Sequence, residues 1–440
     1  MKTWGTCAFW LALILSAPCA LMADEAPANA EPKAAPRKRP EMKAALEQLK
    51  HRKSRLALPP AKEGESTVNN GRARAYFLPA EWQTPNTQNA QRSSSGVRGP
   101  SDPAMTLDYV FTVELFWIAC RINNFHYCLG HQERKLALAG LDDDAIARLD
   151  TDWRAFDPQE FAAFGFARKL TLAPHEVTSS DIEGLRDHYS DAEILEMIYH
   201  VSRYNGTNRW TDSTGIPQDE RAGEEHSVID TPTSAEFSTR ESGVLPDQWV
   251  KRPPLESRSD VEAALSQART REPRVALPDT EQVRQSLPAD LADQPLTSWK
   301  RAIMQFPTTG SGYIRTYQAM QRVGKIPTLL KAQLAWIAAR HDRAWYALDD
   351  ARRRLTELRV SADQQFALDA PAASDFSPAE LAAFAFTEKL TVSPQLISDA
   401  DVAALQAHYS DFEVAEIIAI TCSAATFDRF TESLGLKLED

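Results

Sequence analysis

Apolar residues recur at helical spacing along most of this chain. Between residues 107 and 210 the pattern is helical throughout, and no strand-like alternation of apolar and polar positions survives a count. A short helix is predicted at residues 41–50, and Asn123-Asn124 is expected to break one helix from the next, because both residues tolerate turn conformations. Residues 62–103 are rich in Gly, Ser, Asn, Gln and Pro and indicate a long, partly ordered loop. The sequence therefore predicts an all-α fold.

Helix starts are well marked within this pattern. Asp157 is followed by a proline and then by a glutamate at the third position, which puts an N-cap, a proline at the first helical position and a capping partner in one tetrad. Ser180 and Ser190 open two further capping tetrads. An apolar stripe follows Ser190, and we expect Asn205-Gly206 to end or bend the helix that carries it.

The chain also repeats itself. Trp336 follows Trp117 at an offset of 219 (336 minus 117), and FDPQEFAAFGFARKL at Phe156 recurs as FSPAELAAFAFTEKL at Phe376. Chance similarity would not give almost the same offset, 219 or 220 residues, in several separated blocks. The sequence therefore predicts a tandem duplication of a helical unit of domain size. The helix-capping tetrads recur in the later copy at Ser377, Ser398 and Ser410.

The duplication and the changes in composition divide the chain into five parts. We assign residues 1–23 to a signal peptide, 24–40 to a disordered tether, 41–216 to a first helical repeat, 217–259 to a linker and 260–440 to a second, degenerate repeat. The first repeat carries the candidate site.

The first residues have the pattern of an export signal. Lys2 supplies the positive start, Phe9–Leu15 the apolar run, and small residues near Ala20 and Ala23 offer cleavage sites. The run is short for a bilayer span, and an uncleaved anchor is the alternative. We expect an exported protein, periplasmic or extracellular. The formal net charge of −12 argues against a general nucleic-acid binder, which has a basic face.

Cysteine usage adds a constraint. Removal of the signal leaves Cys120, Cys128 and Cys422, and three thiols cannot all pair within one chain, so at least one is free or paired outside it. On one straight helix, Cys120 and Cys128 would lie about 12 Å apart, beyond disulfide reach. A helix break between them would bring them closer, so their pairing stays open.

A carboxylate, a thiol and an imidazole occur within one short run, at Glu114, Cys128 and His131. Cys128 and His131 are three residues apart and therefore share a helix face. The three groups suit an activated nucleophile, since the imidazole accepts the thiol proton and the carboxylate orients the imidazole. The alternative is an ordinary buried thiol near a hydrogen-bonded histidine and a surface carboxylate. The second repeat loses all three groups together, as expected of groups that act as a unit, and has Gln333, Ala347 and Asp350 in their places.

The stretch RINNFHYCLGH, from Arg121 to His131, resembles the alkylhydroperoxidase D-like, carboxymuconolactone decarboxylase family, here in a two-repeat exported form. In that family a Glu on one helix is followed by Cys-x-x-Cys at the start of the next helix and then by a His. The resemblance implies an all-α fold, assembly as trimers or hexamers, and a peroxide-attacking role for Cys128. It also implies that His131 and Glu114 form the proton relay.

Three departures from that family pattern concern the site. Phe125 stands where the family has its resolving Cys, so an internal Cys-x-x-Cys disulfide is impossible. The spacing from Glu114 to Cys128 is one residue short. His131 follows Cys128 by three positions, whereas many members place the His four positions after, where this chain has Gln132. The resemblance therefore implies a single-cysteine site rather than a two-cysteine cycle.

Three functions stay open at this point. The first is a peroxiredoxin-like thiol oxidoreductase, in which Cys128, activated by His131 and Glu114, attacks a hydroperoxide or other small-molecule substrate and depends on an external thiol reductant. The second is a lactone-acid decarboxylase, in which His131 does acid–base work and Arg121 or Arg209 holds a carboxylate. The third is a non-catalytic helical binding or assembly module. We expect no cofactor, no metal and no nucleic-acid partner, and either a homo-oligomer or an internal pair of repeats.

Overall fold

The computed structural model describes residue 1 and residues 35–61, 68–83, 102–219, 231–247 and 252–439. These residues form helices, turns and irregular segments and contain no β-strand, so the predicted all-α fold is confirmed. The helices of the first half are α1 (Arg39–Gln48), α2 (Asn69–Phe77), α3 (Tyr109–Asn123), α4 (His126–Leu138), α5 (Asp143–Arg148), α6 (Pro158–Leu172), α7 (Ser179–Arg186), α8 (Asp191–Thr214) and α9 (Ala235–Ser238). Those of the second half are α10 (Arg258–Ala268), α11 (Thr280–Ser286), α12 (Ala289–Ala292), α13 (Ser298–Ile303), α14 (Pro307–Arg322), α15 (Thr328–Asp342), α16 (Trp345–Glu357), α17 (Ala362–Ala367), α18 (Pro378–Val392), α19 (Asp399–Gln406) and α20 (Asp411–Ser433).

Helices α3–α8 and α15–α20 follow one another in the same order in the two halves. The start of α15 follows that of α3 at an offset of 219 (328 minus 109), and the start of α20 follows that of α8 at an offset of 220 (411 minus 191). Individual bonds match as well. The carboxylate of Glu196 accepts the backbone N–H groups of Thr106 and Leu107, and that of Glu416 accepts those of Lys325 and Ile326. The helix order and these contacts therefore match between the two halves, and their origin in a tandem duplication stays a prediction.

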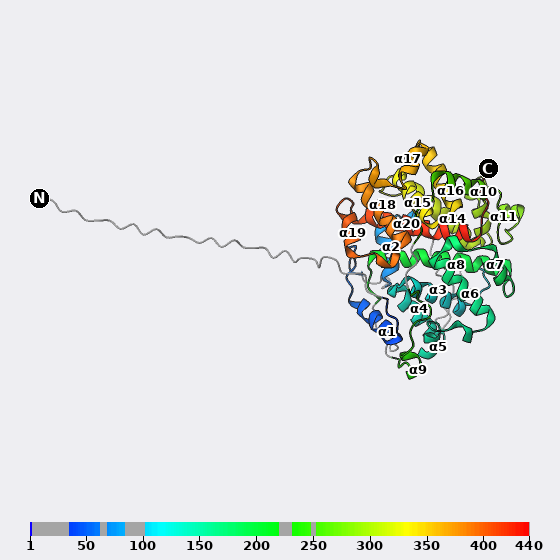
Figure 1. The fold of residues 1–440 in the computed structure, drawn as a ribbon, viewed down its shortest axis with the longest axis vertical. Helices are drawn as coiled ribbons and strands as arrows, with labels where there is room; N and C mark the ends of the chain where they lie inside the picture. Colours follow the sequence, from blue (N-terminus) through cyan, green and yellow to red (C-terminus); the bar gives the residue numbers. More distant parts are fainter. Residues whose placement is uncertain (2–34, 62–67, 84–101, 220–230, 248–251, 440) are drawn as a thin grey trace.

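The two halves pack through α8 and α20, which lie between the remaining helices of the first half and those of the second (Figure 1). Gly206 of α8 lies in close contact with α20. A Cβ atom there would lie 2.2 Å from Oγ1 of Thr426 and 2.7 Å from the carbonyl oxygen of Cys422, both on α20. Thr426 follows Gly206 at an offset of 220 (426 minus 206), so the two equivalent positions face each other, as they do across a two-fold axis.

Two buried arginines cross this contact in opposite directions. Arg209 of α8 donates through Nε to the carbonyl of Leu390 at 3.2 Å, and its counterpart Arg429 of α20 donates through Nη2 to the carbonyl of Thr171 at 3.3 Å. Asp342 pairs with Arg429 at 2.9 Å. Burial, together with the charge of Arg429, lowers the pKa of Arg209 to about 9. The reciprocal bonds tie each half to α6 or α18 of the other.

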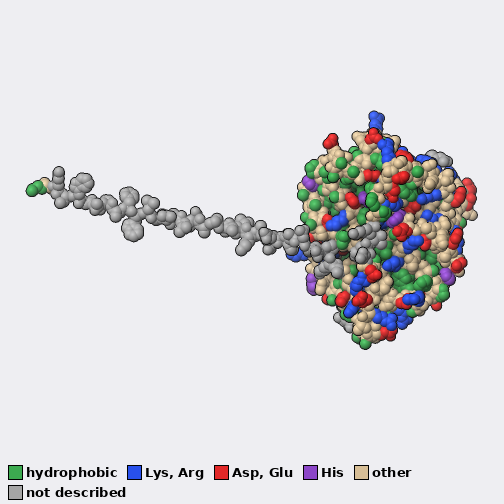
Figure 2. All heavy atoms as spheres, viewed as in Figure 1, with side chains coloured by type: hydrophobic (Ala, Val, Ile, Leu, Met, Phe, Trp, Pro, Cys, Tyr) green, Lys and Arg blue, Asp and Glu red, His purple; other side chains and the backbone are tan. Residues whose placement is uncertain are grey.

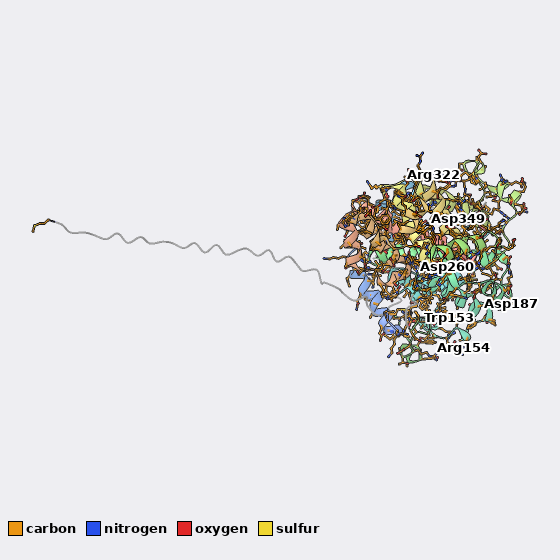
Figure 3. All side chains as sticks on the ribbon, turned by 45° about the horizontal axis from the view of Figure 1, so that its top comes forward. Trp153, Arg154, Asp187, Asp260, Arg322 and Asp349 are labelled. Carbon is orange, nitrogen blue, oxygen red and sulfur yellow. The ribbon has the colours of Figure 1, made fainter. Side chains whose placement is uncertain are left out.

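Acidic and basic side chains are interspersed on the face of the molecule drawn in Figure 2. The labelled side chains of Arg154, Asp187 and Arg322 are exposed or partly exposed and lie on the outside of the helical body (Figure 3). In the part of the chain that the structure describes, no helix is long and apolar enough to cross a membrane.

Several expected boundaries differ in the structure. Helix α8 continues through Asn205-Gly206 rather than ending there, because the Asn205 amide is bonded inside the helix bundle and the glycine leaves space for α20. The capping box before α7 is made by Thr178 and Asp181 and not by the tetrad at Ser180, since Asp181 accepts the backbone N–H of Thr178. The other capping tetrads, in both halves, lie where the sequence predicts them.

Segments predicted as tether, loop and linker are also partly ordered. Within the predicted tether, Arg39 is buried and its guanidinium pairs with Glu133 at 2.7 Å. The predicted loop at residues 62–103 contains α2. In the predicted linker, Glu256 pairs with Arg340 at 3.1 Å. Arg39 in the predicted tether and Glu256 in the predicted linker are thus each held by an ion pair with a buried side chain of the helical body. Residues 2–34 lie outside the described residues. They include the predicted signal peptide, apart from Met1, and most of the predicted tether.

The contact at Gly206 predicts a large effect of adding one methyl group. Gly206→Ala should destabilise the protein by about 2 kcal/mol or more, because the new Cβ meets a backbone carbonyl that cannot turn away. Urea unfolding measures the loss. The matched control is Gly165→Ala, since Gly165 lies within α6 with no atom near its Cβ position, and this change should be neutral or stabilising by up to about 1 kcal/mol. Equal effects of the two changes would contradict the proposed close packing.

Candidate functional site

A helical hairpin brings two thiols together. Helix α3 ends at Asn124, which has a left-handed backbone (φ 58°), and the chain turns so that the N–H of Phe125 donates to the carbonyl of Cys120 at 3.0 Å. Helix α4 then packs back against α3. Cys120 and Cys128 are thereby within hydrogen-bond reach of each other, and both are buried, at 0% and 3% exposure. The expected break at Asn123-Asn124 is confirmed, and it makes the thiols neighbours.

Helix α8 supplies the polar partners of the two thiols. The Cys120 thiol donates to Oδ1 of Asn208 at 3.2 Å. The sulfur of Cys128 lies 3.2 Å from the hydroxyl of Thr211, and either atom can be the donor. The same hydroxyl also lies within reach of the carbonyls of Thr207 and Asn208, so its proton has alternative acceptors when Cys128 is a neutral thiol. The Thr211 hydroxyl can therefore rotate and donate a hydrogen bond to the sulfur of Cys128 when that sulfur is a thiolate.

The two thiols are shifted in opposite directions. Burial and the neighbouring Cys128 raise the pKa of Cys120 well above its usual value. Burial also opposes the thiolate at Cys128, but the neighbouring Cys120 and the hydroxyl of Thr211 outweigh it, and the pKa of Cys128 is lowered. Of the two thiols, Cys128 is therefore the one whose surroundings favour the thiolate, and its role as a nucleophile stays a prediction.

Two cations add to this shift. Lys135, on α4, lies over the ring of Phe116 with Nζ 5.8 Å from the ring centroid. Arg74, on α2, lies over the ring of Trp210 at 5.0 Å. Both charges lower the pKa of Cys128. The site thus draws on four helices, of which α2 lies in the segment that the sequence indicated as a loop.

Glu114 lies on a different face of α3 from Cys120. Six residues separate them, which corresponds to about 120° around a helix, whereas Val113 is seven residues away and within about 20° of the same face. The groups that act on Glu114 are accordingly Glu160, at the start of α6, and Asp108, the N-cap of α3. Burial above all, and then these charges, raise the pKa of Glu114 to about 8. The one-residue shortening noted in the sequence turns this carboxyl away from the thiols.

His131 is engaged with Asp219. Its Nε2 lies 3.2 Å from Oδ2 of Asp219, and its ring lies 4.7 Å from that of Tyr127. Asp219 also accepts the Tyr127 hydroxyl at 3.0 Å and the backbone N–H of Asn69 at 2.8 Å. The position four after Cys128 belongs to Gln132, whose amide donates to the carbonyl of Cys128 at 2.9 Å. The structure therefore gives Cys128 and His131 different partners, and their joint catalytic role stays a prediction.

Sequence reasoning missed the residues that surround the thiols. Asn208 and Thr211 lie in or beside a block that was recognised for its helical pattern and its resemblance to the family's later helices, without a role for either side chain. Asp219 lies in the predicted linker. One signal was present in the repeat: Thr211 is retained as Thr431, whereas Asn208 becomes Asp428. In the described residues, no cluster of three or more His, Cys, Asp or Glu side chains is arranged to hold a metal ion.

Comparisons with known proteins give little further guidance. No family model matches the chain, and no curated protein matches it. Among solved structures, the chain is similar to an alanine variant of the debrominase Bmp8 in complex with 2,3,4-tribromopyrrole, at 20% identity and a TM-score of 0.31. The match covers 44% of this chain and 92% of that protein. A likeness at this level assigns neither family nor activity to the chain, and the resemblance drawn from its motif stays a prediction.

The reactivity of Cys128 should depend on Thr211. Thr211→Val removes a hydrogen bond worth about 1 kcal/mol, so alkylation of Cys128 at pH 7 should slow about fivefold. Iodoacetamide kinetics against pH measure the change, with Cys128→Ser as the blank and Thr211→Ser as the variant that keeps the hydroxyl. A larger loss in His131→Ala than in Thr211→Val would restore the imidazole as the base and contradict the assignment.

The raised pKa of Glu114 predicts a pH dependence of stability. Between the ordinary carboxyl pKa of 4.5 and about 8, the folded state holds a proton that the unfolded state has lost, so the free energy of unfolding falls as pH rises. Glu114→Gln should remove about 3 kcal/mol of the fall between pH 5 and pH 8. Urea unfolding at both pH values measures it. Glu183→Gln, at an exposed carboxylate, serves as control, and parallel curves for wild type and Glu114→Gln would refute the prediction.

Proposed function

We propose that the protein is a thiol oxidoreductase in which Cys128 is the nucleophile and Cys120 the resolving thiol. The observation that supports this assignment is the contact between two buried thiols whose pKa values are shifted in opposite directions. A dithiol of this kind needs one reactive thiolate and one thiol that keeps its proton until a disulfide forms. Cys120 thus takes the role that the absent first cysteine of a Cys-x-x-Cys motif would have.

The proposed reaction reduces a hydroperoxide. The Cys128 thiolate attacks the distal oxygen, a sulfur–oxygen bond forms, the oxygen–oxygen bond breaks, and the leaving alkoxide takes a proton to become an alcohol. Sulfur is oxidised to a sulfenic acid by two electrons, which the peroxide bond accepts. The sulfur of Cys120 then attacks Cys128, a disulfide forms, and hydroxide leaves and becomes water with the proton of Cys120. Two equivalents of an external thiol restore the dithiol.

The surroundings of the thiols favour a small peroxide. Cys128 is 3% exposed, and the stacked rings of Phe116 and Tyr204, 3.9 Å apart, fill the space beside Lys135. An exported location, periplasmic or extracellular, belongs to the proposal and rests on the signal pattern of the first residues. The proposal also includes association of the chain into a homo-oligomer, or of its two repeats into an internal pair.

The two arginines that the decarboxylase alternative needs to bind a substrate carboxylate are already engaged in internal contacts. Arg121 pairs with Asp150 at 2.9 Å and Arg209 donates to Leu390, and both arginines are 1% exposed. A lactone acid would have to break these internal bonds to be held. The site therefore favours thiol chemistry over the decarboxylase reaction.

The proposal is tested by adding one equivalent of hydrogen peroxide to the reduced protein. Mass spectrometry should find a disulfide between Cys120 and Cys128, which dithiothreitol reverses. Cys120→Ser should stop at a sulfenic acid on Cys128 that dimedone traps, and Cys128→Ser should lower peroxide consumption at least a hundredfold. Cys422→Ser is the control that should behave as wild type, since burial raises the pKa of Cys422 to about 12. Peroxide consumption that survives Cys128→Ser would sink the proposal.

A further inference from the structure

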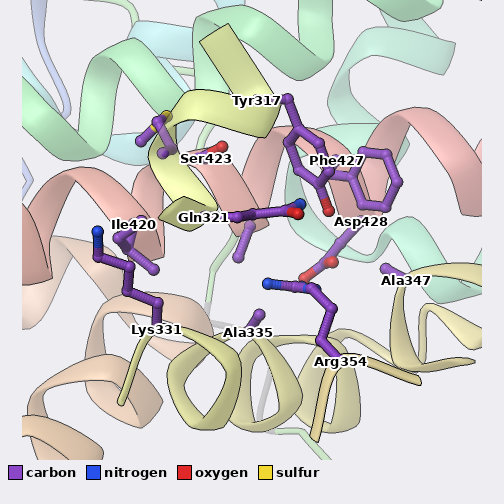
Figure 4. Close-up of a pocket in the computed structure, with 12 residues that line it drawn as sticks. Tyr317, Gln321, Lys331, Ala335, Ala347, Arg354, Ile420, Ser423, Phe427 and Asp428 are labelled. Atoms are coloured by element: carbon purple, nitrogen blue, oxygen red, sulfur yellow. The ribbon is translucent and has the colours of Figure 1, made fainter. Parts of the chain in front are cut away.

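The position that the thiol site has in the first half offers little space in the second. Ala347 is the counterpart of Cys128 at an offset of 219 (347 minus 128), and it lines a cavity between α14, α15, α16 and α20. Gln321, Arg354 and Asp428 point into this cavity from three different helices (Figure 4). Its volume of about 30 Å³ leaves room for one or two water molecules. An organic ligand of the second half therefore needs a different pocket.

A larger pocket of the second half lies between α15, α18 and residues 252–255. Its volume of about 330 Å³ is at the lower end of the range of ligand pockets, about 300–1,000 Å³. Most of its lining residues are apolar, among them Phe384 of α18. Nη2 of Arg343 donates to the carbonyls of two lining residues, Pro253 and Pro254, at 3.0 Å each. These bonds fix one wall of the pocket in advance, which lowers the entropic cost of binding.

In the first half, residues 242–245 lie across the corresponding surface. The N–H of Gly243 donates to the carbonyl of Asp150 at 2.8 Å. Nε of Arg168 donates to the carbonyl of Val244 at 3.0 Å. The two apolar side chains of the segment are buried, at 1% and 4% exposure. A short, apolar, non-helical stretch of the chain therefore covers this surface.

The same positions line the pocket in the second half. Asp369 is the counterpart of Asp150 (369 minus 150 is 219), and Glu388 is the counterpart of Arg168 (388 minus 168 is 220). No backbone N–H of the described residues donates to the carbonyl of Asp369. Glu388 has a carboxylate where Arg168 has a guanidinium, and Nε2 of His341 lies 3.9 Å from it. An occupant of this pocket therefore meets an acceptor where the first-half segment meets a donor.

The charges of the pocket favour a cation beside Glu388. Two other charges of the lining are compensated by ion pairs, Arg252 with Asp342 at 2.7 Å and Asp369 with Arg340 at 2.8 Å. Burial lowers the pKa of His341, so this imidazole is neutral at pH 7 and does not compensate the neighbouring carboxylate. The Glu388 side chain is 55% exposed and can be reached by a charged group from outside. Its negative charge is thus available to a basic ligand.

We propose that this pocket binds a short apolar segment of a partner polypeptide, with a Lys or Arg of that segment paired with Glu388. A backbone N–H of the segment donates to the carbonyl of Asp369, as Gly243 does to that of Asp150, and an apolar side chain fills the pocket. Main-chain hydrogen bonds give such a complex affinity, and the pocket and the charge give it specificity. The proposal does not depend on the thiol chemistry of the first half.

Labelled peptides that carry the sequence of residues 242–246, SGVLP, test the proposal by fluorescence anisotropy with the full chain. SGVLPKK should bind saturably and about fivefold more tightly than SGVLPEE, because Glu388 attracts the one and repels the other. SGSSPKK, which lacks the apolar pair, should bind at least tenfold more weakly than SGVLPKK. Glu388→Arg, which restores the first-half residue, should reverse the preference between SGVLPKK and SGVLPEE.

The matched control is Glu183→Arg, at an exposed carboxylate of α7, because it changes the net charge by the same amount as Glu388→Arg. It should leave the preference for SGVLPKK within twofold of wild type, whereas a general attraction to an acidic chain would weaken equally in both variants. Circular dichroism checks that both variants fold. Four results overturn the proposal: no saturable binding of SGVLPKK at millimolar concentration, equal binding of SGVLPKK and SGVLPEE, equal binding of SGVLPKK and SGSSPKK, or a preference for SGVLPKK that survives Glu388→Arg.

Discussion

The close packing of α8 against α20 at Gly206 is the constraint on which the rest of the structure depends. Thr426 occupies the space that a side chain at Gly206 would need, and the arginines on either side reach across in opposite directions. Helix α8 also carries Asn208 and Thr211, the polar partners of the two thiols. The helix that joins the halves therefore also positions these two side chains against α3 and α4.

The scaffold positions are more alike between the two halves than the positions around the thiols are. The ion pair between Arg121 and Asp150 recurs as Arg340 with Asp369 at 2.8 Å, and it holds the same pair of elements in each copy. The stack of Phe116 on Tyr204 does not recur. Loss of a core ring pair costs several kcal/mol unless the space relaxes, and loss of Arg340 would remove the ion-pair partner of the partly buried Asp369. The two halves therefore share the ion pair of the scaffold and differ in the side chains that lie beside Cys128 and Ala347.

The helical architecture could be predicted from the sequence because its signals are local. Capping tetrads such as the one at Ser190 state where a helix begins, and a repeat of one spacing multiplies that evidence. Gly206 was misjudged for the same reason: a glycine that admits a neighbouring helix has the same local pattern as one that ends a helix. The neighbourhood of Cys128 was beyond local reading, since Arg74 and Thr211 arrive from helices far away in the chain, and Asp219 from a segment with no pattern at all. Of the residues in this neighbourhood, only Cys128 itself could be recognised from the sequence.

The spacing of the motif predicts a relay, whereas the structure gives Glu114 and His131 partners other than Cys128. A helix turns about 100° per residue, so a single deletion moves a side chain to the neighbouring face. Glu114 therefore faces α6, and His131 faces Asp219. A buried thiolate without an adjacent base must be stabilised by donors and cations. Cys120, Thr211 and the charges on α2 and α4 supply them. These groups lower the pKa of Cys128, and in the proposed reaction they would stabilise its thiolate.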